Sequence, residues 1–292
     1  MRRARLAFSA ALGLALLGTA LNADAFCLTH GCSDRRQKCE YDQQECLLTG
    51  PLLHWGSSCV SFDVQSDGSP LRNVSYLDAH QAIVDAFRQW LSADCGGSTH
   101  PFIHISDFGP VECHEAEYNQ AAPNANIFMF RDDSWPYDNA IDTLALTTLI
   151  FNADNGEIYD ADVEVNTFES PMSLGKIGKT DVDFHSVITH EIGHFLGLSH
   201  SNMPGATMGP RYAPGDTTMA SIAQDDIEGV CTALPSNRKT VSRQCEPRHG
   251  FSGQCAPAYT CGFAPGSPGG SGSLLLVVLA LSSTLLRKRS RP

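Results

Sequence analysis

Three histidines, separated by four and then six residues, set the tightest constraint on how this chain can fold. They lie in the stretch THEIGHFLGLSH, residues 189–200. On a helix, His190 and His194 project from one face with their Cβ atoms about 5–6 Å apart. Gly197 stands where such a helix would end, and glycine accepts the left-handed conformation that turns a chain sharply. That turn would return His200 to the same point.

Three imidazole nitrogens that meet at one point are a typical ligand set for Zn²⁺, which they bind at about 2.0–2.1 Å. Three protein ligands leave the fourth tetrahedral position open, as in catalytic rather than structural zinc sites. Glu191 follows the first histidine and therefore points to a neighbouring side of the helix. There it could take a proton from an attacking water and later give it to a leaving amine. The pattern predicts a catalytic zinc site with Glu191 as general base.

The N-terminal segment predicts export. Residues 1–25 combine a basic start, an apolar run and the small-residue sequence Ala23-Asp24-Ala25, as in a cleaved signal peptide. The apolar run is short for a membrane-spanning helix, which is the alternative. We therefore expect an exported protein, extracellular or attached to the cell surface or outer membrane.

The C-terminal segment, residues 269–292, joins a Gly/Ser stretch to the apolar run 274–286 and a basic cluster. As a helix, an apolar run of this length would reach about 20 Å, short of a hydrocarbon core of about 30 Å. The tail resembles bacterial C-terminal sorting signals of the Gly-Gly and myxobacterial types. The resemblance implies transient membrane association, then cleavage and release or surface attachment. A permanent short anchor is the alternative.

Composition narrows the possible partners. Of 292 residues, 42% are apolar, which is enough for one good-sized core. The formal net charge of −12 argues against nucleic acid as a partner, because binding phosphate requires a basic face. A strongly acidic secreted domain often binds Ca²⁺, although a merely soluble surface is the default. We expect a monomer.

Cysteine usage predicts a disulfide framework, since the chain is expected to be exported. The chain has 11 cysteines, an odd number, and Cys261, just before the tail, is the one expected to lack a partner. Cysteines crowd into two flanking segments, residues 26–50 and 237–268, while the spacing leaves the connectivity open.

The region between these segments, residues 51–236, has the pattern of one α+β domain. Alternating or apolar stretches predict strands, and helix-period stretches with start signals at Ser75 and Ser221 predict helices. The strands are expected at 59–64, 101–106, 126–130, 144–151 and 160–166, and the helices at 75–91, 182–196 and 221–234.

Several motifs together resemble the matrixin family, the matrix metalloproteinases. The histidine stretch has the form H-E-x-x-H-x-x-G-x-x-H and is followed by Met208, the metzincin signature. GATMGPRY (205–212) resembles the family's Met-turn, A-L-M-x-P-x-Y. AQDDIEG (223–229) resembles its closing helix, and SYLDAHQAIVDAFRQW (75–90) its first helix. The resemblance covers roughly 55–234.

The resemblance implies a metzincin-like catalytic domain: a twisted, mostly parallel five-stranded sheet, three helices and a substrate cleft across the zinc. Met208 would form an apolar floor under the metal, and Asp225 and Asp226 would brace the Met-turn. The implied activity is hydrolysis of peptide bonds in extended polypeptides.

The resemblance also implies substrate contacts. Residues 144–149, with Leu146 and Thr147, match the edge strand that pairs with the substrate backbone. Pro210 and Tyr212 would line the wall of the S1′ pocket. Ser186 is a small residue at a position that limits the depth of this pocket, which favours large apolar P1′ side chains.

Two departures from the family pattern matter. The segments that would hold a second, structural zinc carry acids instead of histidines, so a second zinc is not expected. Asp154, Asp160, Asp162 and Glu164 could bind Ca²⁺ through oxygen ligands, and an acidic exposed turn is the alternative. The family's zinc-blocking propeptide motif is missing. An N-terminal cysteine (27, 32, 39 or 46) could replace it, but disulfide pairing is the expected fate.

The sequence thus predicts an exported, matrixin-like zinc endopeptidase. One rival is a surface binding or adhesion module that keeps the fold without useful turnover. Glu191 argues against it, because a scaffold has no use for that carboxylate. A second rival is a narrow enzyme, an exopeptidase or a processing protease with a single target.

Overall fold

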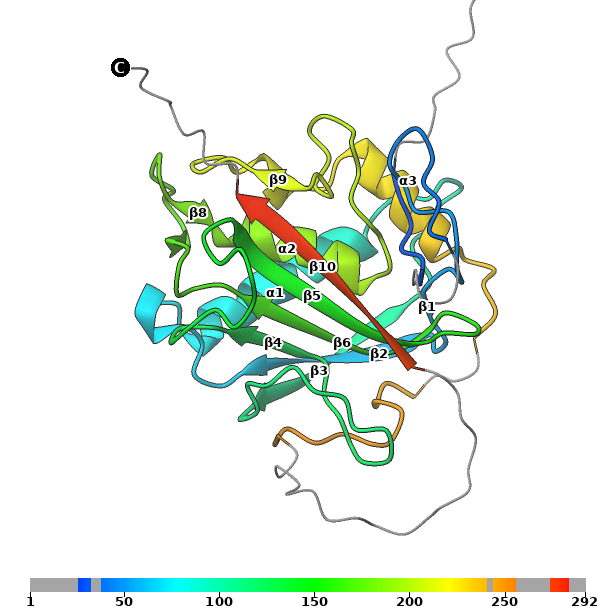
Figure 1. The fold of residues 1–292 in the computed structure, drawn as a ribbon, viewed down its shortest axis with the longest axis horizontal. Helices are drawn as coiled ribbons and strands as arrows, with labels where there is room; N and C mark the ends of the chain where they lie inside the picture. Colours follow the sequence, from blue (N-terminus) through cyan, green and yellow to red (C-terminus); the bar gives the residue numbers. More distant parts are fainter. Residues whose placement is uncertain (1–25, 33–37, 241–243, 256–273, 284–292) are drawn as a thin grey trace, which may run out of the picture.

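The computed structural model describes residues 26–32, 38–240, 244–255 and 274–283 (Figure 1). The strands are β1 (His54–Trp55), β2 (Cys59–Gln65), β3 (His104–Val111), β4 (Ile127–Phe130), β5 (Thr143–Asn152), β6 (Glu157–Val165), β7 (Met172–Ser173), β8 (Val182–Asp183), β9 (Arg211–Tyr212) and β10 (Leu274–Ser283). The helices are α1 (Tyr76–Leu91), α2 (Phe184–Phe195) and α3 (Gln224–Ala233), with short 3-10 turns at Pro70–Arg72 (η1) and Thr218–Ala220 (η2).

One large sheet organises the molecule, with strands in the order β3-β2-β4-β6-β5-β10-β9. The first four of these are parallel, and β5 runs antiparallel to β6. The predicted α+β fold, with a mostly parallel five-stranded sheet and three helices, is therefore confirmed. The sheet also contains more strands than predicted. β1 pairs with the start of β6, and β10 and β9 lie beyond β5, which was expected at the edge.

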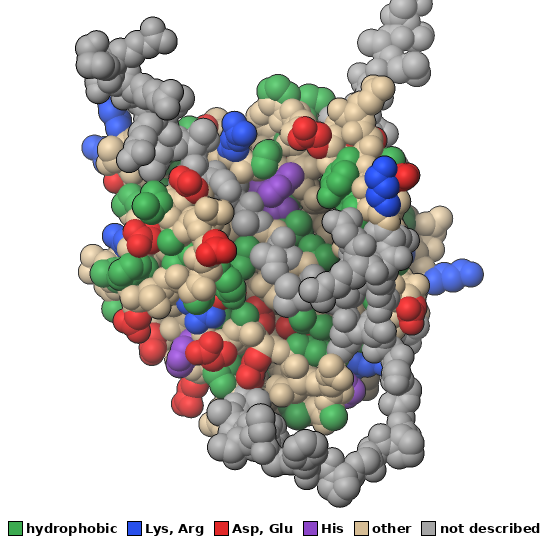
Figure 2. All heavy atoms as spheres, in the orientation of Figure 1, with side chains coloured by type: hydrophobic (Ala, Val, Ile, Leu, Met, Phe, Trp, Pro, Cys, Tyr) green, Lys and Arg blue, Asp and Glu red, His purple; other side chains and the backbone are tan. Residues whose placement is uncertain are grey.

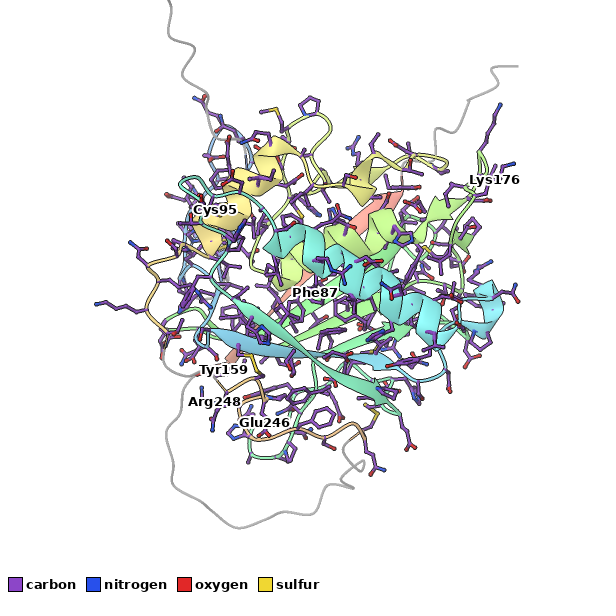
Figure 3. All side chains as sticks on the ribbon, turned by 180° about the vertical axis from the view of Figure 1, so that it is seen from behind. Phe87, Cys95, Tyr159, Lys176, Glu246 and Arg248 are labelled. Atoms are coloured by element: carbon purple, nitrogen blue, oxygen red, sulfur yellow. A yellow bond between two sulfur atoms is a disulfide. The ribbon has the colours of Figure 1, made fainter. Side chains whose placement is uncertain are left out.

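Helices α1 and α2 pack on one face of the sheet and enclose the main core (Figure 3). Phe87 of α1 stacks edge-on against Phe128 of β4 and Phe195 of α2, with ring centroids 5.8 and 5.4 Å apart. All three rings are buried, and each contributes roughly 2 kcal/mol of hydrophobic stabilisation. This packing fixes α2, the helix that carries the paired histidines, against the sheet.

Local signals set two of the helix starts and fail at the third. Ser75 caps α1, since its side chain accepts a hydrogen bond from the Asp78 N–H, as predicted. Asp183 caps α2 by accepting from Ser186 N–H. For α3 the predicted start at Ser221 is wrong. The cap position is Ala223, whose N–H donates to the Asp226 carboxylate at 2.8 Å, because that carboxylate also organises the preceding turn.

Five disulfides confirm the expected framework and supply the connectivity that the sequence left open. The bonds are Cys27–Cys46, Cys32–Cys39, Cys59–Cys245, Cys95–Cys231 and Cys113–Cys255. The four N-terminal cysteines are thus all oxidised, and none offers a thiol to a metal. Cys261 lies outside the described residues.

The N-terminal segment, residues 26–50, packs beside the turn that follows α2. Leu28 pairs antiparallel with Leu198. The Thr29 N–H donates to the Gly197 carbonyl at 3.0 Å, and the Ser199 N–H donates to the Cys27 carbonyl at 2.8 Å. This segment therefore supports, by backbone pairing, the turn that leads to His200.

The conformation of the apolar C-terminal run differs from the helix considered in the sequence analysis. Its described part, residues 274–283, is strand β10 rather than a helix. In the described part of the chain, no helix is long and apolar enough to cross a membrane. The expected signal peptide and the basic cluster lie outside the described residues.

Candidate metal centre and active site

The three predicted ligands converge as their spacing indicates. His190 and His194 project from α2, and Gly197, with φ of 104°, turns the chain so that His200 returns to them. Ring centroids are 4.7 Å apart for His190 and His194, 5.3 Å for His190 and His200, and 4.9 Å for His194 and His200. One nitrogen from each ring lies within 4.8 Å of the others. Figure 2 shows histidine side chains on this face, close to α2.

Backbone carbonyls fix the orientation of two of the rings. Nδ1 of His190 lies 2.7 Å from the Thr207 carbonyl, and Nδ1 of His194 lies 2.9 Å from the Leu198 carbonyl. A carbonyl only accepts, so each Nδ1 donates and the lone pair is on Nε2. Within the described part of the chain, Nε2 of all three histidines is buried and has no hydrogen-bond partner.

The electrostatics of the cluster keep the rings neutral, the form that binds metals. Burial lowers the pKa of His190 to about 3, helped by the nearby His200, and burial lowers that of His200 to about 4. Burial also lowers the pKa of His194 well below its usual value. Three neutral, buried, unpartnered nitrogens aimed at one point fit Zn²⁺, because an orphaned buried acceptor is otherwise costly.

Glu191 is fully buried beside this cluster, and β5 holds it. Thr147 on β5 donates its hydroxyl hydrogen to Glu191 Oε2. Among the described residues, Oε1 has no partner. Burial raises the pKa of Glu191 to about 8, and the Thr147 hydrogen bond opposes that rise. The sequence placed Thr147 only on the substrate side, and no motif indicated its contact with the carboxylate.

The turn around Met208 lies under the histidines and is braced as expected. The Asp226 carboxylate accepts from the N–H groups of Thr207 and Met208, at 2.7 and 3.0 Å. Asp225 accepts from the Ser201 hydroxyl at 2.6 Å. The Thr207 carbonyl also accepts a hydrogen bond from His190 Nδ1. By holding Thr207, Asp226 therefore helps to orient the His190 ring.

Gly193, inside the histidine motif, is a constraint that the sequence analysis missed. A Cβ built on it would lie 2.2 Å from Met208 Sδ and 2.9 Å from Trp90 Cζ2. Only glycine lets α2 approach the Met208 side chain this closely. A glycine between two histidines of one helix could have indicated this close approach.

The residues predicted to contact substrate fall around the same helix. Leu146 lies on β5 and Tyr212 on β9, both buried, while Pro210 is half-buried. Asp183 joins two of the predicted residues. Its carboxylate accepts from the Ser186 hydroxyl at 2.7 Å, and its N–H donates to the Tyr212 hydroxyl at 2.9 Å. The Ser186 side chain is thus used in capping α2.

The four acids predicted for calcium lie along the β5–β6 turn and β6, with different partners. Asp154 is exposed, whereas Asp160 and Asp162 are buried and burial raises the pKa of each. Asp162 accepts from the Ile127 N–H at 2.9 Å. Glu164 accepts from Arg131 and from the Tyr137 hydroxyl. In the described part of the chain, the four do not come together as a group that could share one ion.

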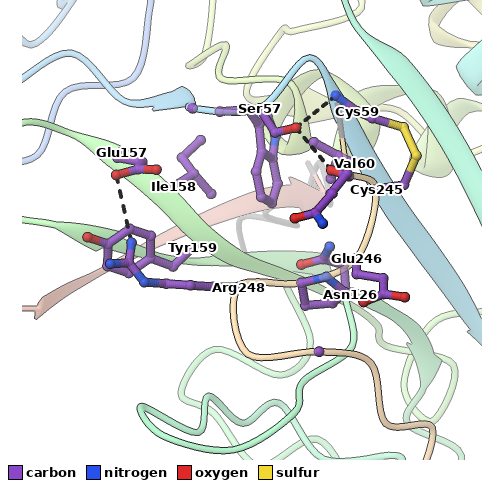
Figure 4. A pocket seen from close by; sticks show the side chains of 15 residues that line it. Ser57, Cys59, Val60, Asn126, Glu157, Ile158, Tyr159, Cys245, Glu246 and Arg248 are labelled. Carbon is purple, nitrogen blue, oxygen red and sulfur yellow. Dashed lines mark hydrogen bonds and ion pairs between the residues drawn. A yellow bond between two sulfur atoms is a disulfide. The ribbon is translucent and has the colours of Figure 1, made fainter. Parts of the chain in front are cut away.

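A separate cavity of about 280 Å³ lies where residues 244–250 cover β6 and the start of β2 (Figure 4). Its described lining includes none of the three histidines. The Arg248 guanidinium lies 4.1 Å from the centre of the Tyr159 ring and 3.8 Å from the Glu157 carboxylate. With the Cys59–Cys245 bond, these contacts attach the C-terminal appendage to the sheet.

A helix-borne His-Glu-x-x-His, a third histidine after a glycine turn and a methionine beneath them define the metzincin class of zinc-dependent proteases. Residues 54–233, more than half of the chain, match the family model described as matrixin. The chain belongs to the matrixin family.

Named relatives agree with this assignment. Neutrophil collagenase of Homo sapiens is 33% identical over 186 residues, 63% of this chain and 34% of that protein. Matrilysin of Homo sapiens is 37% identical over 98 residues, 34% of each chain. Metalloendoproteinase 1-MMP of Arabidopsis thaliana is 36% identical over 108 residues, 37% of this chain and 28% of that protein. The matches thus span about a third of each of these curated relatives.

Proposed function

We propose that this protein is an exported zinc-dependent endopeptidase that hydrolyses internal peptide bonds of extended polypeptides. One observation carries the proposal. Three buried, unpartnered Nε2 atoms converge on one point, directly beside a buried carboxylate that also has an unpartnered oxygen. A purely structural metal site would not need that carboxylate.

His190, His194 and His200 would hold the zinc, which when bound supplies Lewis-acid polarisation of the scissile carbonyl and of water. Glu191 takes the proton from the attacking water and delivers it to the leaving amine. Thr147 holds Oε2, which leaves Oε1 to face the reacting atoms. The backbone of β5 aligns the substrate by strand pairing.

The S1′ pocket of this enzyme would lie between α2 and β9. The Tyr212 hydroxyl is tied to Asp183, and Pro210 precedes β9 by one residue. With a residue as small as serine at position 186, we expect the pocket to be deep and to favour large apolar P1′ side chains. A cleavage profile without any P1′ preference would contradict this.

The compartment and the ancillary sites belong to the same proposal. Five disulfides support an oxidising, extracellular location, and residues 1–25 would direct export. Residues 269–292 would associate with the membrane transiently, before β10 joins the sheet. The catalytic domain would span 51–236, between Cys-rich appendages at 26–50 and 237–268, in a monomer. A calcium site among Asp154, Asp160, Asp162 and Glu164 stays a prediction, testable by the shift of the thermal midpoint with added Ca²⁺.

The alternative is a surface binding or adhesion module that keeps this fold without turnover, since the Cys-rich appendages could bind partners. A further alternative is an exopeptidase. Cleavage of a peptide blocked at both ends distinguishes an endopeptidase from an exopeptidase. Zinc binding without cleavage of any peptide would favour the binding module.

The experiment is cleavage of an internally quenched peptide library by the zinc-loaded protein and by its Glu191→Ala variant. We expect kcat/KM to fall by roughly a hundredfold or more in the variant, because a general base is lost while the ligands remain. Zinc content of both proteins is the control. Equal cleavage by both would remove Glu191 from the mechanism. No cleavage by the zinc-loaded protein, with β10 in place or disrupted, would overturn the proposed enzymatic activity.

A further inference from the structure

Strand β10 lies along the part of the sheet where a substrate would pair. It runs antiparallel to β5 over nearly the whole length of that strand, from Leu274 opposite Asn152 to Ser282 opposite Thr143. At its end it also pairs parallel with β9, Ser282 with Arg211 and Ser283 with Tyr212. Figure 1 shows β10 crossing the face of the molecule beside β5, in front of α2.

The register brings β10 next to the candidate active site. Leu279 is opposite Thr147, whose hydroxyl holds Glu191, and Ala280 is opposite Leu146. Val277 and Leu279 are partly buried and pack against the main core. β10 therefore meets three of the residues predicted to bind substrate, Leu146, Thr147 and Tyr212, and contacts α2 as well.

An edge strand offers unpaired N–H and C=O groups to one added strand at a time. While β10 is paired with β5, the outer hydrogen-bonding side of β5 has no room for an extended polypeptide. We propose that Leu274–Ser283 is the resident ligand of the substrate groove and that it competes with substrate. This inference rests on the proposed function, because the groove matters only if the site cleaves polypeptides.

The chemistry of β10 suits a ligand that can leave. Its sequence, LLLVVLALSS, has no charge and no cysteine, so backbone pairing and apolar packing hold it rather than a covalent bond. Because it belongs to the same chain, its effective concentration at the groove is on the order of millimolar. A substrate must therefore displace it. The edge of β5 that accepts this strand is suited to uncharged, apolar, extended segments.

The test uses the full chain and a double variant, Val278→Pro/Leu279→Pro. Successive N–H groups of a strand point to opposite sides, so two adjacent prolines must remove at least one donor to β5. Ser271→Pro, three residues before β10, is the matched control. We expect kcat/KM for an apolar quenched peptide to rise at least tenfold in the double variant, through a lower KM, and to stay unchanged in the control. Equal, measurable values of kcat/KM in all three proteins would overturn the proposal.

A second readout does not depend on activity. In the full chain, outward amides of β5 should exchange with deuterium slowly, and in the double variant at least tenfold faster, while the amides of α1 stay protected in both. Equal β5 exchange in both proteins would overturn the proposal even if the enzyme is active. Faster β5 exchange without cleavage by any protein would leave the resident strand standing and overturn the proposed function.

Discussion

Two segments outside the matrixin-matched region 54–233 meet the candidate site, and they do so in opposite ways. The N-terminal segment contains two disulfides and pairs with residues 197–199, in the turn that leads to His200. Strand β10 lies in front, on the substrate side, and is held without any covalent bond. The first segment completes the site, and the second covers it. The segment that supports the turn before His200 is fixed by disulfides, whereas β10 can leave the edge of β5 reversibly.

This contrast changes the expected result of removing each segment. Because the printed sequence does not contain the family's propeptide motif, residues 26–50 are a candidate for a segment that blocks the site. Their contacts run instead to the turn carbonyl of Gly197 and to Leu198. Deleting them should weaken zinc binding, and releasing β10 should increase cleavage.

We expect a large effect from removing the disulfide that anchors the N-terminal segment. In the variant Cys27→Ser/Cys46→Ser we expect the free energy of unfolding to fall by about 3 kcal/mol, the value for a closed loop of this size. Zinc should also dissociate faster, because the Cys27 carbonyl holds Ser199 beside His200. Denaturant unfolding and zinc release to a chelating dye measure the two effects.

The matched control is Cys32→Ser/Cys39→Ser, which opens a shorter loop between cysteines seven residues apart. It should cost less stability and leave zinc release at the parent rate. Equal zinc release in both double variants would contradict the supporting role of the N-terminal segment.

A smaller effect is expected where β5 meets both β10 and the candidate base. Thr147→Val keeps the shape of the side chain and removes the hydrogen bond to Glu191 Oε2. We expect kcat to fall by about tenfold, because a buried carboxylate loses one of its partners, with little change in KM. Steady-state kinetics on a quenched peptide measure both constants.

Thr148→Val, one residue along β5, is the control and should leave kcat near the parent value. If both variants lower kcat equally, the effect comes from disturbing β5, and Thr147 has no special role in holding the base.

An acid on β2, Asp63, serves as a reference for both segments. Burial, with the nearby charge of Asp107, raises the pKa of Asp63 to about 8 from an ordinary value of 3.8. Between these values the folded state keeps a proton that the unfolded state has lost, so stability falls as pH rises from about 4 to 8. Asp63→Asn should remove this pH dependence, a slope of about 1.4 kcal/mol per pH unit between the two pKa values.

Thermal midpoints of parent and Asp63→Asn at pH 5 and pH 8 measure this difference. The parent midpoint should fall more than that of the variant across this window. Parallel midpoints would show that Asp63 ionises normally in the folded protein. Zinc release should not differ between the two proteins, because Asp63 lies on β2.

The parts that the sequence predicted are those encoded by local spacing. The positions of His190, His194 and His200 follow from helix period and one glycine turn. Strands β2, β4, β5 and β6 follow from their apolar or alternating runs, whereas the strand expected at 101–106 is β3, which spans His104–Val111. Asp226 was predicted from its motif and does brace Met208. In each case the partners are close in sequence, or their positions follow from the family motif.

The features that the sequence did not predict depend on contacts between residues far apart in the chain. LLLVVLALSS has no periodicity to separate a membrane segment from a strand, so only tertiary contact with β5 decides its conformation. The hydrogen bond between Thr147 and Glu191 joins residues 44 apart, and the disulfide Cys59–Cys245 joins residues 186 apart. Neither pairing has a local signature.

The most direct test of the central claim is a zinc titration of the metal-stripped protein, with bound zinc and peptide cleavage recorded together. We expect cleavage to be lost on chelation and to return in proportion to zinc up to one equivalent per chain, because the three histidines form one site. His194→Ala, carried through the same titration, should recover neither tight zinc binding nor cleavage. Full cleavage by the metal-free protein, or a parent that binds one zinc and cleaves no peptide in either the full chain or the β10 double variant, would contradict the account.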